Sequence, residues 1–202
     1  MTKPMPCAIG LSVHTGWAAC CVVSGDLREP EILAREVVEM LGDQERFVFH
    51  RAAQIAPADA ERGVTRARED AVRAATGALD LLVGRMRAQG RSITRCAIVA
   101  RQGAMPPLEE VVKAHPRIHT AEGVFFRDVL RDAAESHRVA TQVFPPRELE
   151  ALAAKAMTIP PAKLAKLLVR AGKGLGPPWG KDERIASLAA WTALSTRPPE
   201  QI

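Results

Sequence analysis

Polar side chains that could do chemistry lie in two short stretches of this chain. Ser12 and His14 lie around a turn between two apolar runs, where His14 could accept a proton or contact a phosphate and Ser12 could bind a ligand phosphate. His119 and Glu122 lie at the start of an aromatic-rich helical pattern, and Glu122 projects onto its apolar arc, where a carboxylate is open to perturbation. Each has an ordinary structural interpretation as well: a solvated turn histidine, a small residue facing a central helix, or a first-turn acid complementing the helix dipole.

A row of cations near the end of the sequence is the main candidate for binding a polyanion. Four of them fall within about 80° on one face of a predicted helix, and the row continues into the next helix. Such a row can follow a chain of phosphates, and the ordinary alternative is a solvated helix face. The cations are Lys163, Lys166, Arg170, Lys173, Lys181 and Arg184.

Trp179 lies beside these cations in a Gly/Pro-rich loop, residues 172–180. Its indole could stack on a base or another ring, or it could pack on its own domain. The chain carries 28 Lys and Arg against 23 Asp and Glu, a formal charge of +5. That balance favours contact with polyanions without requiring it.

Three apolar, strand-forming runs open the chain and position the first candidate stretch. Residues 7–11 and 17–23 flank a glycine-containing turn, which is the pattern of a β-hairpin, and residues 31–41 follow as a third strand. Cys20 and Cys21 are neighbours in the second strand, so their side chains should point to opposite faces of the sheet. Further strands are predicted at 94–100 and 139–144, and residues 47–50 are placed in a loop or an added strand.

Helical periodicity fills most of the remaining sequence. A long amphipathic pattern begins at Pro57 and ends at Gly90, and its apolar stripe is mostly alanine, so this helix can lie close to what it covers. The next helix stops before Pro116, and Thr120 is a good N-cap for the aromatic-rich helix that runs to about His137. The other predicted helices cover 108–114, 147–157, 161–171 and 181–195.

This element order is βββαβαβα with extra C-terminal helices, and it predicts an α/β fold. Three antiparallel strands should be followed by parallel strands in one mixed five-stranded sheet, with helices on both faces. The 202 residues suit a single domain with a loose tail at residues 1–6. Four cysteines without a CxxC pair or a secretory signal indicate buried, reduced thiols in a cytoplasmic protein, and no run is long enough to span a membrane.

The order resembles the ribonuclease H-like superfamily, most of all the RuvC branch of Holliday-junction resolvases. In that branch the first strand reads G-I-D-x-G, followed by a Gly/Thr turn and G-Y/W-A-V-V, and residues 10–18 (GLSVHTGWA) follow the same rhythm. The last helix of that branch carries an acid before A-L-A-x-A, and residues 181–190 (KDERIASLAA) are similar, as is the run 167–174 before it. The resemblance implies a ribonuclease H-like sheet, DNA or RNA as partner, and a homodimer.

The departures from that family concern its acidic site. Family nucleases cleave phosphodiesters with two divalent metals held by three or four carboxylates, because hard cations need anionic oxygen ligands. Here the first-strand acid falls at Ser12, and the acid expected after the fourth strand falls near Ala100 or Arg101. On the last helix Asp182 or Glu183 remains, and Asp182 lines up with the alanines that should meet the sheet. We therefore expect no metal site and no cofactor, with Mg²⁺ as the alternative.

Three functions remain open, and so does the question of whether the protein is an enzyme. The first is a RuvC-like protein that binds nucleic acid through the basic row and the Trp179 loop but lacks standard two-metal cleavage. The second is an enzyme with a rebuilt site that acts on a phosphate or acyl group, provided its residues converge in one cleft. The third is a protein-interaction domain with an exposed apolar patch on the Phe125 helix. The rebuilt site would use His14, Arg101, His119, Glu122 and Asp182.

Overall fold

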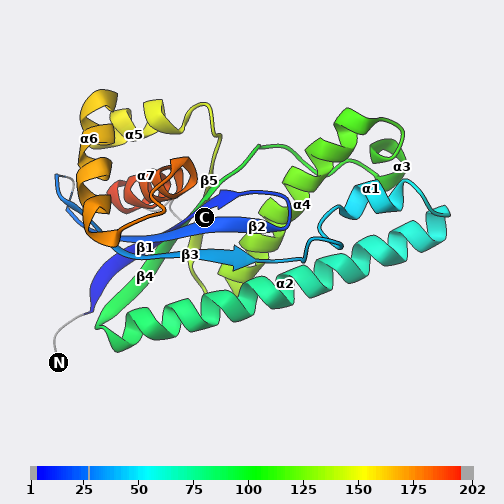
Figure 1. The fold of residues 1–202 in the computed structure, drawn as a ribbon, viewed down its shortest axis with the longest axis horizontal. Coiled ribbons are helices and arrows are strands. Elements are labelled where there is room, and N and C mark those ends of the chain that lie inside the picture. Colours follow the sequence, from blue (N-terminus) through cyan, green and yellow to red (C-terminus); the bar gives the residue numbers. More distant parts are fainter. Residues whose placement is uncertain (1–3, 27, 197–202) are drawn as a thin grey trace, which may run out of the picture.

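The computed structural model describes residues 4–26 and 28–196, which are built around one five-stranded mixed sheet (Figure 1). The strands are β1 (Met5–Val13), β2 (Trp17–Gly25), β3 (Pro30–Glu39), β4 (Arg91–Val99) and β5 (Ala140–Phe144). Their order across the sheet is β3-β2-β1-β4-β5. The first three strands are antiparallel, whereas β1 pairs parallel with β4, and β4 with β5. The predicted mixed sheet is therefore confirmed.

Helices cover both faces of this sheet, as Figure 1 shows. The long α2 and α4 lie on one face together with the short α1, and α5, α6 and α7 lie on the other. None of the helices within the described ranges has the length and apolar character needed to cross a membrane. The helices are α1 (Val48–Ala52), α2 (Pro57–Ala88), α3 (Leu108–Val111), α4 (His115–Ser136), α5 (Leu149–Met157), α6 (Pro161–Gly172), the 3-10 turn η1 (Lys173–Leu175) and α7 (Lys181–Ser195).

β1 is buried on both faces because it lies in the middle of the sheet between these two helical layers. Its odd-numbered residues, such as Ile9 and Leu11, join the core formed with α2 and α4. Side chains alternate along a strand, so even-numbered residues, including Ala8 and Ser12, face the other layer. The same alternation sends Cys20 and Cys21 to opposite faces, since Cys20 joins the α2–α4 core and Cys21 Sγ approaches Glu183 O of α7.

α7 crosses β1 at very short range, and the contact depends on Gly10. A Cβ added to Gly10 would lie 1.8 Å from the carbonyl oxygen of Ala186 and 2.7 Å from its carbonyl carbon. Only a residue without a side chain can stand there with the helix backbone in this position. The small residues of α7, among them Ala189 and Ala190, are fully buried against the sheet. This contact brings the first turn of α7 to the carboxyl end of β1.

The predicted element boundaries need three corrections. Residues 48–52 form α1, so placing 47–50 in a loop or strand was wrong; Phe49 anchors this turn by an edge contact with Phe125, 5.8 Å between ring centroids. Met5 and Pro6 belong to β1, whereas residues 1–3 of the predicted tail lie outside the described residues.

The largest correction concerns the start of α4. Pro116 does not stop a helix; it lies in the first turn of α4, where its missing N–H has no intrahelical partner to lose. Thr120 is therefore not an N-cap but an interior residue whose Oγ1 donates to Pro116 O at 3.0 Å. Phe125 and Phe126 are buried, so the exposed apolar patch expected on this helix is absent from the described part of α4. The protein-interaction hypothesis loses its main support.

Candidate functional site

Ser12 and Asp182 meet where β1 ends and α7 begins. Ser12 is the second-last residue of β1 and faces α7, and Asp182 lies in the first turn of that helix. Ser12 Oγ donates to Asp182 Oδ1 at 3.5 Å, a long hydrogen bond. The Gly10 contact fixes this meeting, because it sets how far α7 slides along β1.

His14 follows β1 directly and turns its ring toward the same carboxylate. Its backbone N–H donates to Trp17 O at 2.9 Å, which closes the hairpin turn. The imidazole stacks on the Trp17 indole, with ring centroids 4.2 Å apart and an interplanar angle of 8°. His14 Nε2 lies 3.1 Å from Asp182 Oδ1, although the two groups are not aligned as a hydrogen bond. Both side chains are about one-third exposed, 36% and 34%.

Asp182, and not Glu183, is the acid that faces the sheet. Glu183 bends back to the start of its own helix, where its Oε2 accepts from Gly180 N–H at 2.8 Å in a capping box. The site around Ser12 therefore holds one carboxylate from α7. Within residues 4–26 and 28–196, no three carboxylates come close enough together to share a metal ion.

Arg101 lies on the loop that leaves the carboxyl end of β4. It is exposed and lines a surface pocket with Pro145 and Arg147, which follow β5. Arg127 of α4 is 4% exposed and holds this loop, since its Nη1 donates to Arg101 O at 2.9 Å and to Gly103 O at 2.8 Å. Sequence reasoning missed Arg127, because an arginine on a helix gives no sign that it will be buried.

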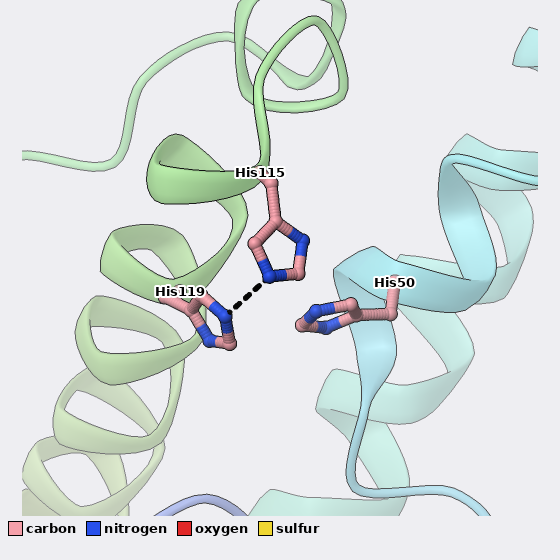
Figure 2. Close-up of side chains that lie close together, drawn as sticks. All are labelled: His50, His115 and His119. Carbon is pink, nitrogen blue, oxygen red and sulfur yellow. Dashed lines mark hydrogen bonds between the residues drawn. The ribbon is translucent and has the colours of Figure 1, made fainter.

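His119 and Glu122 belong to a different cluster, on the side of the sheet covered by α2 and α4. Because α4 begins at His115, His119 lies in its second turn and Glu122 at the start of its third, and His115 and His119 share one face. His50 of α1 points toward them (Figure 2), and its Nδ1 is hydrogen-bonded to Glu122 Oε1 at 2.8 Å. No hydrogen bond or ion pair recorded among the described residues joins this cluster to His14, Arg101 or Asp182.

The rebuilt site required five residues to converge in one cleft, and the described residues do not meet that condition. His14 and Asp182 lie together at the hairpin, His119 and Glu122 lie together beside α1, and Arg101 lies on the β4 loop. The sequence placed His119 and Glu122 around the start of a helix capped by Thr120, whereas α4 already begins at His115 and turns both residues toward α1.

The predicted row of cations is presented to solvent. Arg170 Nη2 lies 3.9 Å from Glu29 Oε1, a loose contact between two exposed side chains. The lysines of the row form no ion pair with any described residue. All six are exposed, and only the last two share the first turn of α7 with Asp182: Lys163, Lys166 and Arg170 on α6, Lys173 on η1, and Lys181 and Arg184 on α7.

Trp179 packs on its own domain. A Cβ at Gly172 would lie 2.1 Å from the indole, so the ring covers the last residue of α6. Arg35 of β3 holds the rest of the loop by donating to the carbonyl oxygens of Gly176, Pro177 and Pro178. The ring is thus half-buried in an anchored loop beside the basic row.

The four cysteines are free and buried. Burial raises the pKa of Cys7 and Cys21 to about 11 and that of Cys96 to about 12, and raises the pKa of Cys20 well above its ordinary value. A thiol protonated at neutral pH is a weak nucleophile and a poor metal ligand. Their role is packing.

Comparison with known proteins gives a structural relationship without a sequence family. No protein-family model matches this chain, and no curated protein matches it. It is similar to the solved structure of Thermus thermophilus RuvC, with a TM-score of 0.50, 13% identity, and coverage of 94% of this chain and 93% of that chain. It is also similar to T. thermophilus RuvC in complex with Holliday junction substrate, with a TM-score of 0.51, 13% identity, and coverage of 94% and 92%. The chain has a RuvC-like fold.

Proposed function

We propose that this protein is a RuvC-like nucleic-acid-binding protein that does not catalyse standard two-metal cleavage. The observation that carries the proposal is the contact between Ser12 and Asp182. A hydroxyl stands on the central strand where the resemblance implies a carboxylate, and one acid faces it. Under this proposal the protein has the fold and a binding surface like those of the family it resembles, but it lacks the ligands for a pair of hard cations.

A single carboxylate is too few ligands for the two metal ions that standard cleavage requires. Mg²⁺ and Mn²⁺ require several oxygen ligands, and two of them held side by side need bridging carboxylates to offset their mutual repulsion. Among residues 4–26 and 28–196, the polar partners of the Asp182 side chain are Ser12 Oγ and the imidazole of His14. A histidine and a serine are poor replacements, because neither supplies an anionic oxygen.

Support for binding comes from the basic row and from one structural relative. One of the similar structures is of RuvC in complex with Holliday junction substrate. Here the cations of α6 and η1 are exposed, and so are Lys181 and Arg184 in the first turn of α7, the turn that also carries Asp182. Phosphates placed along them would release counterions, which gives affinity without requiring base recognition. Under this proposal DNA or RNA is the partner.

Fluorescence anisotropy across a salt series tests the binding step. Labelled single-stranded, duplex and four-way DNA would be titrated with the protein and with the Lys166→Glu/Arg170→Glu double variant. We expect the variant to bind at least about a hundredfold more weakly and its log K against log salt slope to fall by about 2.

A matched control separates this surface from net charge. The Arg66→Glu/Arg87→Glu variant changes the total charge equally, but both side chains are exposed on α2, on the opposite face of the sheet. It should bind nearly as the unchanged protein does. Equal weakening by both double variants, or no binding at low salt by the unchanged protein, would refute the proposal.

A second candidate function rests on the His14–Asp182 pair. Nε2 and Oδ1 are 3.1 Å apart, so the carboxylate could hold the ring for proton transfer at a phosphate or acyl group. Activity on phosphate or acyl esters that disappears in both His14→Gln and Asp182→Asn, with DNA binding retained, would favour this function over the first.

Location and assembly belong to the same proposal. The four thiols are all unpaired, which suits a reducing cytoplasm. A homodimer is implied by the family resemblance alone. Light scattering at the protein concentrations used for binding gives the mass of the species in solution directly.

A further inference from the structure

We infer that the three histidines between α1 and α4 form a site for a transition metal of the Zn²⁺ class. His50, His115 and His119 each present a ring nitrogen, and these nitrogens all lie within 4.8 Å of one another. This site shares no residue with the Ser12–Asp182 contact and does not depend on nucleic-acid binding.

The helices supply the geometry. His115 and His119 are four residues apart in α4, so they stand one above the other on a single face. α1 lies against that face and brings His50 opposite them, as Figure 2 shows. The site thus joins two segments separated by the whole length of α2 and β4.

The rings pack edge to face rather than in a stack. The interplanar angles are 76° for His50–His115, 65° for His50–His119 and 86° for His115–His119, with centroids 4.4–5.1 Å apart. Ring nitrogens bind metals through lone pairs in the ring plane, and because one nitrogen of each ring lies within 4.8 Å of the others, rotation of the side chains can turn these lone pairs to a common point. A stacked arrangement, such as His14 on Trp17, would not do this.

The closest pair is His115 Nε2 and His119 Nε2, which are 2.9 Å apart. Only one of these nitrogens can carry the proton between them, so one lone pair already points at the other ring. Tetrahedral Zn–N bonds of about 2.0–2.1 Å place ligand nitrogens about 3.3 Å apart. Small side-chain rotations therefore convert the cluster to a ligand set.

Glu122 supplies the second, independent observation. Its side chain is 2% exposed, and its Oε1 lies 2.8 Å from His50 Nδ1. This bond fixes the proton of His50 on Nδ1 and leaves Nε2 with a free lone pair, the arrangement found behind histidines that bind metals.

The donor set selects the kind of metal. Three imidazoles with no oxygen ligand suit Zn²⁺, Co²⁺, Ni²⁺ or Cu²⁺ and exclude Mg²⁺ and Ca²⁺ as preferred ions. His115 and His119 are exposed, so solvent reaches the site and the fourth tetrahedral position is left for water or a ligand. Bound metal would also fasten α1 to α4.

Metal titration of protein without a histidine tag tests this inference. After treatment with a chelator, Zn²⁺ binding would be measured by calorimetry, and Co²⁺ by its visible tetrahedral absorption. We expect one ion per chain, no displacement by excess Mg²⁺, and a higher Tm with Zn²⁺. His115→Ala and His119→Ala should each weaken binding about a hundredfold or more, whereas His137→Ala, at the far end of α4, should leave it unchanged.

Both decisive variants change exposed helix residues to alanine, so they should fold, and circular dichroism without metal verifies it. Glu122→Gln keeps all three ligands and should weaken binding about 10–100-fold, as expected for a positioning residue. No Zn²⁺ uptake at concentrations well above that of the protein would overturn the site. Binding that survives both alanine substitutions would overturn it as well.

Discussion

Two histidine–carboxylate pairs lie on opposite sides of the sheet, and they differ in what surrounds them. His14 lies 3.1 Å from Asp182, and His50 lies 2.8 Å from Glu122. At the hairpin both side chains are about one-third exposed, and a tryptophan covers the imidazole. Beside α1 the carboxylate is almost fully buried, and two more histidines face the ring.

The difference lies in which partner is held rigidly. Glu122 is enclosed by the helix layer, so it fixes the orientation of His50 and presents a nitrogen to its neighbours. Asp182 remains in contact with water, and its neighbours Ser12 and His14 add no anionic charge. The His50–Glu122 pair therefore has the surroundings of a metal ligand. The His14–Asp182 pair has those of a surface that can meet phosphates beside Lys181.

The largest expected effect comes from a substitution that disturbs the hairpin region and leaves the histidine cluster intact. Gly10→Ala would place a Cβ 1.8 Å from Ala186 O, and α7 would have to move away from β1. We expect a loss of about 3 kcal/mol or more in the free energy of unfolding, because two backbones must separate. Urea denaturation measures it. Zn²⁺ affinity of the folded variant should be unchanged, and a loss of less than about 0.5 kcal/mol would contradict this packing.

Removing Glu122 and removing Asp182 should lower the free energy of unfolding of the protein by different amounts. Glu122→Ala leaves Nδ1 of the partly buried His50 without its partner and should cost about 2–3 kcal/mol in metal-free protein. Asp182→Ala removes a carboxylate that is about one-third exposed and should cost about 1 kcal/mol or less. Denaturation midpoints of both variants give the comparison. Equal losses would show that burial does not distinguish the pairs.

Adding a carboxylate should move the hairpin region toward a hard-cation site. Ser12→Asp places a second carboxylate beside Asp182 and should lower stability by about 1 kcal/mol, or Tm by about 3 °C. Millimolar Mg²⁺ should restore part of the loss, because two carboxylates can share a cation. Thermal unfolding with and without Mg²⁺ measures this. In the Ser12→Asp/Asp182→Asn control the Mg²⁺ effect should disappear.

The smallest expected effect concerns the sheet that both regions share. Burial raises the pKa of Cys96 to about 12, while in the unfolded chain the thiol titrates near 9.0. The thiol loses its proton at a higher pH in the folded protein than in the unfolded chain. The contribution of Cys96 to the free energy of unfolding is therefore constant below pH 9 and falls as pH rises toward 12. One thiol should account for about 1 kcal/mol between pH 8 and pH 10. Between pH 8 and pH 10 the free energy of unfolding of Cys96→Ala should therefore fall by about 1 kcal/mol less than that of the unchanged protein. Urea denaturation at both pH values measures the difference.

Most of the fold could be predicted from the sequence because its signals are local. Alternating and continuous apolar runs marked all five strands, and the alanine stripe marked α2. Helical angles put Asp182 on the face of the last helix that should meet the sheet, but the choice between Asp182 and Glu183 stayed open, and the contact with Ser12 is seen only in the structure. Periodicity did not show that Gly10 permits the close crossing on which this meeting depends.

The histidine site could not be found because of two local misreadings. Pro116 was interpreted as a helix stop, although proline also suits the first turn of a helix, and the two cases look alike in sequence. His115 then fell outside the helix and its spacing to His119 carried no meaning. His50 was placed in a loop or strand, since α1 has five residues and is stabilised by packing of Phe49 on Phe125 rather than by its own sequence.

The most direct test of the account uses a labelled four-way junction saturated with the protein in the presence of Mg²⁺ or Mn²⁺. Electrophoresis under native and denaturing conditions reports binding and strand cleavage from the same sample. The account predicts a retained complex with uncut strands. Metal-dependent cleavage that is lost in Asp182→Asn would contradict it, because a site with one carboxylate would then hold the catalytic cations.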